Sequence, residues 1–153
     1  MRNAILSTLV AVCVAAPAFA QELTWRQDIQ PILKKQCGAC HGPDKPEYAE
    51  WLVLREKDKN LSSRMDTYAH FMNYVTWPAT GAVMRRLDDG KAAGGKPGNM
   101  HAYLGSTDEE RAANLDKIKR WLGDGAWNLN RWETRGSTAG VAKEQIDKIK
   151  AKY

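Results

Sequence analysis

The chain has few of the residues from which most metal and redox sites are built. Its 153 residues include three cysteines and three histidines. Cys13 lies in an apolar stretch near the start, so the rest of the sequence holds only Cys37 and Cys40. A structural zinc site needs a second closely spaced pair of ligands, and His70 and His101 are far apart. A thioredoxin-like dithiol is typical of a βαβ context, and no segment has the pattern of a strand.

Apolar runs long enough to cross a bilayer are also missing. Residues 1–20 combine a basic residue, an apolar stretch and an Ala-x-Ala cleavage site ending at Ala20, which predicts a cleaved secretory signal. A membrane span needs about 20 apolar residues, and this stretch is shorter and is interrupted by Pro17. An uncleaved membrane anchor is the alternative. We expect Cys13 to be lost with the signal, which leaves residues 21–153 as a single domain with no transmembrane span.

The two remaining cysteines belong to the sequence Cys37-Gly38-Ala39-Cys40-His41. Cys-x-x-Cys-His is the pattern of covalent c-type haem attachment. Its spacing holds both thiols within one turn, so both can add to the vinyl groups along one porphyrin edge. The adjacent imidazole then lies under the iron as the proximal ligand. The motif therefore predicts one covalently bound haem c per chain, held by Cys37 and Cys40 and ligated by His41.

Around this motif the sequence resembles the cytochrome c family, most nearly its small single-haem class I members, over residues 28–42 and 97–123. The resemblance implies an all-α, class I cytochrome c-like helical domain around one haem. Its core segments would be about 24–42 and 97–123, with a helical insertion over 43–96 and a C-terminal extension over 124–153. The resemblance also implies a periplasmic location, because bacterial c-type cytochromes receive their thioether bonds outside the cytoplasm.

Helical signals recur along the whole chain. We expect helices over 28–37, 46–59, 63–76, 82–87, from Ser106 or Thr107 to Leu122, and over 139–150. For the first helix, Asp28 is a suitable N-cap, but Thr24 with Gln27 offers an earlier start at Trp25 with a kink at Pro31.

The resemblance further implies that the last of the core helices crosses the first beside the haem. The expected contact joins Ile29, Ile32 and Leu33 to Ile118, Trp121 and Leu122. In the tail, we expect Trp127, Leu129 and Trp132 to pack back on the body, with Val141, Ile146 and Ile149 turned inward. The expected haem-pocket walls are Trp77, Tyr103, Leu104 and Trp121.

The second axial ligand is open to several assignments. Met100 is favoured, because it follows a glycine- and proline-rich loop and precedes the last core helix, an order that resembles the class I pattern. The family usually has proline after this methionine, whereas this chain has His101, and histidine binds iron more strongly than a thioether does. The alternatives to Met100 are His101, Met84, His70, Met65 and Met72.

These observations predict a periplasmic single-haem electron carrier, not an enzyme, that exchanges electrons with redox protein partners. One alternative is a haem protein with an open or labile distal site for gas binding, sensing or peroxidatic chemistry, with His70 as a distal base. Another is the cytochrome subunit of a larger oxidoreductase, with the insertion and the tail as its interface.

The charge distribution bears on the partner. Without the signal the chain has 22 basic and 18 acidic residues, a net charge of +4. Residues 131–153 contain six basic residues against three acidic ones. Such a run is usually a solvated surface, but it could also steer an acidic or membrane-bound redox partner. Nucleic acid is not an expected partner of an exported haem protein.

Overall fold

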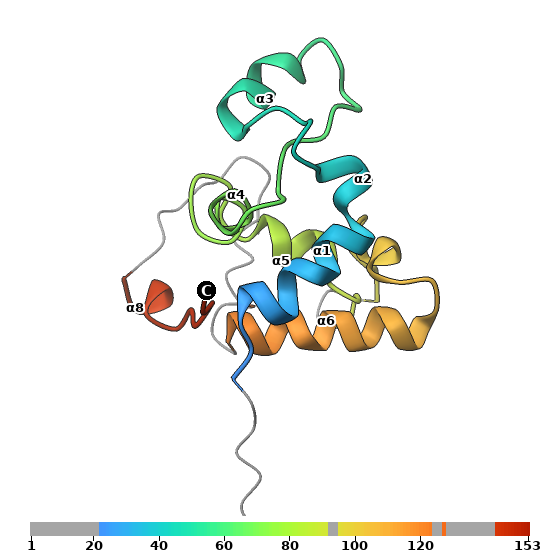
Figure 1. The fold of residues 1–153 in the computed structure, drawn as a ribbon, viewed down its shortest axis with the longest axis vertical. Coiled ribbons are helices and arrows are strands. Elements are labelled where there is room, and N and C mark those ends of the chain that lie inside the picture. Colours follow the sequence, from blue (N-terminus) through green and yellow to red (C-terminus); the bar gives the residue numbers. More distant parts are fainter. Residues whose placement is uncertain (1–21, 92–94, 124–126, 128–142) are drawn as a thin grey trace, which may run out of the picture.

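The computed structural model describes residues 22–91, 95–123, 127 and 143–153 (Figure 1). Within these residues all regular secondary structure is helical, so the all-α prediction is confirmed. The elements in chain order are the π-helix η1 (Trp25–Ile29), α1 (Gln30–Gln36), α2 (Gly38–His41), α3 (Tyr48–Leu54), α4 (Tyr68–Met72), α5 (Ala82–Leu87), the 3-10 helix η2 (His101–Leu104), α6 (Asp108–Leu122) and α8 (Lys143–Ile146). None of the helices described is both long and apolar enough to cross a membrane.

The first helical stretch begins at Trp25, as the alternative start predicted. The Thr24 side chain accepts a hydrogen bond from the Gln27 amide at 3.3 Å. Asp28 is therefore not the N-cap; its carboxylate accepts a hydrogen bond from the Thr24 amide at 2.8 Å, which completes the cap from inside the helix. Pro31 falls in the first turn of α1, where its missing N–H costs little.

The last core helix, α6, has the predicted bounds. The Thr107 side chain caps it by accepting from the Glu110 amide at 3.2 Å, and the Glu110 carboxylate accepts from the Ser106 amide at 2.8 Å. The pair resembles a capping box, except that Glu110 accepts from the residue before the N-cap instead of from the N-cap itself. The helix ends before Gly123, whose φ of +89° is a conformation that favours glycine.

The middle of the chain is less helical than predicted. The helix expected over 46–59 is confined to α3, and the one expected over 63–76 is confined to α4. Thr67, not Ser63, caps α4, because its hydroxyl accepts from the His70 amide at 3.2 Å. Ser63 instead lies in a segment without regular structure, where it is buried. The short helix α5 agrees with its prediction.

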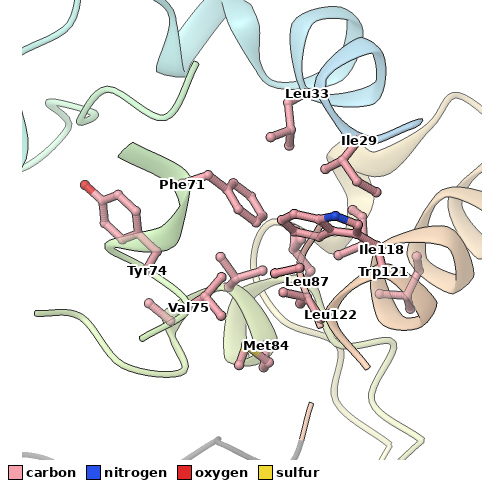
Figure 2. Close-up of a cluster of buried hydrophobic side chains, with 14 of the residues drawn as sticks. Ile29, Leu33, Phe71, Tyr74, Val75, Met84, Leu87, Ile118, Trp121 and Leu122 are labelled. Atoms are coloured by element: carbon pink, nitrogen blue, oxygen red, sulfur yellow. The ribbon is translucent and has the colours of Figure 1, made fainter. Parts of the chain in front are cut away.

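The hydrophobic core brings η1, α1 and α6 together with α4 and α5. Figure 2 shows Ile29 and Leu33 directed toward the same cluster as Ile118, Trp121 and Leu122, as the sequence predicted. Ile32 is buried as well, but it lies outside this cluster. The residues contributed by α4, α5 and the turn between them are Phe71, Tyr74, Val75, Ala82, Val83, Met84 and Leu87.

Aromatic rings form the centre of this core. The Trp25 ring is 1% exposed, and its centroid lies 5.5 Å from that of Phe71, 5.7 Å from that of Tyr68 and 5.8 Å from that of Trp121. Buried aromatic side chains remove a large apolar area from water and interact through ring edges and faces. Trp25 therefore links the start of the helical domain to α4 and α6.

The last residues of the chain close the junction between α6 and η1. The Lys150 and Ala151 amides donate to the Leu122 and Trp121 carbonyls at 3.0 Å each. The Lys152 carbonyl accepts from the Trp25 amide and from the Trp121 indole N–H, both at 2.8 Å. These bonds satisfy backbone groups that helix ends leave without intrahelical partners.

The tail therefore packs on the body as predicted, within the part that the structure describes. Trp127 contacts the core, and its indole N–H donates to the Asp88 carboxylate at 3.0 Å. Ile149 is half-buried against the core. The inward orientation predicted for Ile146 is wrong, because α8 ends there and leaves the side chain 45% exposed. Leu129, Trp132 and Val141 lie outside the described residues.

Tyr68→Phe tests the contribution of the C-terminal segment to stability. The Tyr68 hydroxyl donates to the Ala151 carbonyl at 2.9 Å, and phenylalanine keeps the ring while losing this bond. We expect the free energy of unfolding to fall by about 1 kcal/mol, the usual net value of such a bond. Denaturant unfolding of the holoprotein measures it, and an unchanged midpoint would show that the segment is not held there in solution.

Candidate haem-binding site

The Cys-x-x-Cys-His motif forms one helical turn at the end of α1. The Cys37 amide donates to the Leu33 carbonyl at 2.9 Å, which makes Cys37 the last member of the α1 hydrogen-bond pattern. The Cys37 carbonyl then accepts from the Cys40 amide at 3.1 Å and the His41 amide at 2.9 Å. Residues separated by three and four positions in a helix share one face. The turn therefore presents two thiols and an imidazole on the same side.

The two thiols are not joined to each other and have different surroundings. Both cysteines are free; Cys40 is exposed, whereas Cys37 is partly buried against the hydrophobic core. Burial, together with the neighbouring Cys40, raises the pKa of the Cys37 thiol to about 11. Before any thioether bond forms, Cys37 is therefore a neutral thiol at physiological pH, packed on the core, with Cys40 beside it at the surface.

The His41 ring has one nitrogen engaged in a hydrogen bond to the backbone. Its Nδ1 lies 2.6 Å from the Ser63 carbonyl oxygen. A carbonyl can only accept, so Nδ1 carries the hydrogen and Nε2 keeps its lone pair. Burial lowers the pKa of His41, the Ser63 hydrogen bond acts in the opposite direction, and the nearby positive charge of Arg86 lowers it further. The imidazole is therefore neutral at physiological pH, with Nε2 available to a metal.

The chain returns to this motif through residues 61–67. The His41 carbonyl accepts from the Met65 amide at 3.0 Å, and the Pro46 carbonyl accepts from the Arg64 amide at 2.9 Å. Gly42 follows the motif in close contact with it, since a Cβ there would lie 2.6 Å from the Gly38 carbonyl oxygen. The motif turn and the returning segment thus hold each other through backbone contacts.

The loop that carries Met100 is attached to the end of α5. The Met100 amide donates to the Arg86 carbonyl at 2.9 Å, and the Gly98 amide donates to the Asp88 carbonyl at 2.8 Å. The Met100 side chain is half-buried against the core. His101 follows it, and its Nδ1 lies 3.1 Å from the Leu87 carbonyl oxygen. The helix η2, which begins at His101, contacts both α1 and α5.

The other candidate ligands lie in two kinds of surroundings. Met84 is 1% exposed inside the hydrophobic core, and Met65 and Met72 are half-buried against it. His70 instead belongs to a polar cluster: its Nδ1 lies 2.8 Å from the Thr67 hydroxyl, and its Nε2 lies 3.6 Å from a Glu47 carboxylate oxygen. The structure therefore places the sulfur candidates on the core and His70 among charged side chains.

The four residues expected to form the haem-pocket walls fall into a buried pair and an exposed pair. Leu104 and Trp121 are core residues, whereas Trp77 is 73% exposed and Tyr103 is 63% exposed.

Within the described residues, no group of three or more histidine, cysteine or acidic side chains has the arrangement of a metal cluster. Two free thiols and a histidine Nε2 on one helical face are instead the donor set that a covalently bound haem requires.

Comparison with known proteins gives two matches. A family model described as PccH Cytochrome c matches residues 24–153. The chain belongs to the PccH family of cytochromes c. It is 46% identical to the solved monohaem cytochrome PccH from Geobacter sulfurreducens, with a TM-score of 0.72 over 87% of this chain and 100% of that one. A search of curated proteins gave no match. Like other PccH-family cytochromes, the chain carries one covalently bound haem c, and electron transfer is the activity of this family.

Sequence reasoning missed two residues beside the motif of this PccH-family chain. The sequence predicts Ser63 as the start of a helix and indicates no role for Tyr74. The structure places the Ser63 carbonyl against His41 and the Tyr74 hydroxyl against the Ser63 side chain. A backbone carbonyl has no sequence signature, because every residue carries one. Only the path of residues 61–67 back to the motif brings Ser63 to this position.

Gly98→Ala tests the attachment of the Met100 loop. A Cβ at Gly98 would lie 2.3 Å from the Arg85 carbonyl oxygen and 2.4 Å from that of Arg86, so the loop must move away from α5. We expect stability to fall by about 1–3 kcal/mol, as for other overpacked sites. With Met100 as the predicted second ligand, we also expect the near-infrared band of sulfur-ligated oxidised iron to weaken.

The matched control is Gly38→Ala within the motif turn. A Cβ there meets its nearest neighbour, the Leu33 carbonyl oxygen, at an ordinary 3.9 Å, so stability and spectrum should stay close to wild type. Equal behaviour of the two variants in absorption and unfolding measurements would contradict the close packing at Gly98.

Proposed function

We propose that this cytochrome is a periplasmic one-electron carrier with an iron ligated by His41 and Met100 and a haem attached through Cys37 and Cys40. The observation that carries the proposal is the state of the motif turn. His41 has Nδ1 bonded to the Ser63 carbonyl and Nε2 unengaged by that bond, on the face that also presents both free thiols. This combination supports proximal ligation by His41 and thioether formation by both cysteines.

Bound haem supplies the one-electron Fe(III)/Fe(II) couple. The chain's own residues hold the group and control its surroundings. Cys37, packed on the core, and Cys40, at the surface, fix its position from one helical turn. His41 is held in one tautomer and one orientation by Ser63. Ligation by His41 and Met100 would hold the iron from two side chains in both oxidation states, so the chain would rearrange little on electron transfer.

Two features support Met100 as the second ligand. Its backbone is hydrogen-bonded to the end of α5, and η2, the helix that follows it directly, contacts α1, the helix that leads into the motif. Its side chain is half-buried against the core, whereas that of Met84 is fully buried within it. A thioether ligand favours Fe(II) relative to a second imidazole, so this ligation raises the reduction potential.

The periplasmic location rests on the signal pattern of residues 1–20 and on the chemistry of c-type haem attachment. The partners proposed are redox proteins with an acidic surface or proteins bound to the membrane. Residues 131–142, about half of the basic segment 131–153, lie outside the described residues, so docking through that segment stays a prediction. The interaction of His70 with Thr67 and Glu47 argues against its use as a distal base, which weakens the gas-binding alternative.

Absorption spectra of the purified holoprotein test the electron-carrier function. We expect the oxidised protein to show the weak near-infrared band of sulfur-ligated iron, and the reduced protein to show no change on addition of carbon monoxide, because both axial positions are filled. Rapid carbon monoxide binding or a high-spin oxidised form would mean an open or labile site, and the simple carrier would then be rejected.

Replacement of the methionines tests the distal ligand. Met100→Ala should abolish the near-infrared band, allow carbon monoxide to bind and lower the reduction potential, because the thioether is lost. Met84→Leu is the matched control: Met84 is buried in the core, and a Met-to-Leu exchange of similar volume usually costs less than about 1.5 kcal/mol. If Met100→Ala keeps the wild-type spectrum and potential, Met100 is not the ligand.

A further inference from the structure

Ser63, whose carbonyl accepts a hydrogen bond from the proposed metal-ligating histidine, belongs to no helix or sheet. It lies in a segment without regular secondary structure, between α3 and α4, yet it is only 3% exposed. Its neighbours Arg64 and Met65 are tied by backbone hydrogen bonds to Pro46 and His41. What keeps the Ser63 carbonyl at 2.6 Å from His41 Nδ1 must therefore come from tertiary contacts.

The Ser63 side chain has such a contact with Tyr74, which lies in the turn after α4. The Tyr74 hydroxyl donates a hydrogen bond to the Ser63 side-chain oxygen. The tyrosine is 7% exposed, and burial raises the pKa of its hydroxyl, which therefore stays a donor at physiological pH. Figure 2 shows Tyr74 at the edge of the core cluster, with its hydroxyl directed away from the other labelled side chains.

Tyr74 is itself held from several directions. Its carbonyl accepts from the Val83 amide of α5 at 3.0 Å. Its ring meets that of Tyr48 on α3 edge to face, with centroids 5.5 Å apart and planes at 73°. Its side chain belongs to the hydrophobic core cluster. A donor fixed by a backbone bond, a ring contact and core packing is a rigid support for the serine that it binds.

We propose that Tyr74 and Ser63 are positioning residues for the proximal histidine: the Tyr74 hydroxyl fixes Ser63, and the Ser63 carbonyl in turn orients His41 and sets the strength of its Nδ1–H hydrogen bond. This inference rests on the proposed ligation of iron by His41. A stronger bond from Nδ1–H makes the imidazole a better electron donor through Nε2. Fe(III) gains more from such a donor than Fe(II) does, so this contact lowers the reduction potential.

The decisive variant is Tyr74→Phe, which keeps the ring and removes the hydroxyl. In the holoprotein we expect the reduction potential to rise. We also expect the His41 Nδ1–H to exchange with solvent deuterium faster, by roughly fivefold, as the loss of one neutral hydrogen bond allows. Potentiometric titration and proton NMR of the reduced protein measure these two effects. Unchanged potential and unchanged exchange would overturn the proposal, even if the variant is less stable.

Tyr68→Phe is the matched control. It also removes one tyrosine hydroxyl that donates a hydrogen bond, but its acceptor is the Ala151 carbonyl in the C-terminal segment. A purely structural role for Tyr74 predicts that both variants lose stability and that neither changes the potential. The positioning role predicts a potential shift for Tyr74→Phe only, and equal shifts in the two variants would also overturn it.

Ser63→Ala removes the same hydrogen bond from its other end and serves if Tyr74→Phe does not fold. The variant keeps the backbone carbonyl that accepts from His41 but loses the side-chain oxygen that Tyr74 binds. We therefore expect the reduction potential of this variant to rise as well. Because both changes act on one contact, the double variant should shift no more than the larger single shift; additive shifts would contradict a shared path. The proposed function is tested separately by the wild-type spectrum, so loss of that proposal and loss of this one are distinguishable.

Discussion

The hydrogen bond between the His41 imidazole and the Ser63 carbonyl is the contact on which the proposed haem site depends. It selects the tautomer that frees Nε2, and it joins the motif turn to a segment 22 residues further along the chain. The 61–67 segment can lie there because Met65 and Arg64 donate to carbonyls of the motif and of the loop after it. Because residues 61–65 form no helix, their backbone groups are available for these hydrogen bonds to the motif and to the loop after it.

The hydrophobic core supports the same site from the other side. Leu33, which lies one turn before the motif, belongs to the core cluster around Trp25 and Trp121. Cys37, within the motif, packs against the same cluster. The final residues of the chain form hydrogen bonds with backbone groups at the end of α6 and at the start of η1. The position of the motif turn therefore depends on α6 and on the C-terminal segment, although neither contains a residue proposed to bond to the haem or to ligate its iron.

Local patterns predicted those elements whose signals act within a few residues. The α6 box of Thr107 and Glu110, the Thr24 start of η1 and the bounds of α5 follow from side chains that reach their own backbone. The prediction was wrong at Ser63, where a tertiary partner outcompeted the local cap, and at Ile146, where α8 ends and the side chain is exposed. At Ser63 a tertiary contact overrode the local preference.

The sequence by itself determined the chemistry of the site, since Cys37, Cys40 and His41 are adjacent and one helical turn suffices to place them on one face. It also determined the all-α class, and the predicted meeting of Ile29 with Ile118 in the core is confirmed. Only the tertiary structure decided which backbone carbonyl orients His41, that Tyr74 holds that carbonyl's residue, and that the Met100 loop is tied to α5. These contacts join residues far apart in the chain through groups common to every residue, so no local pattern encodes them.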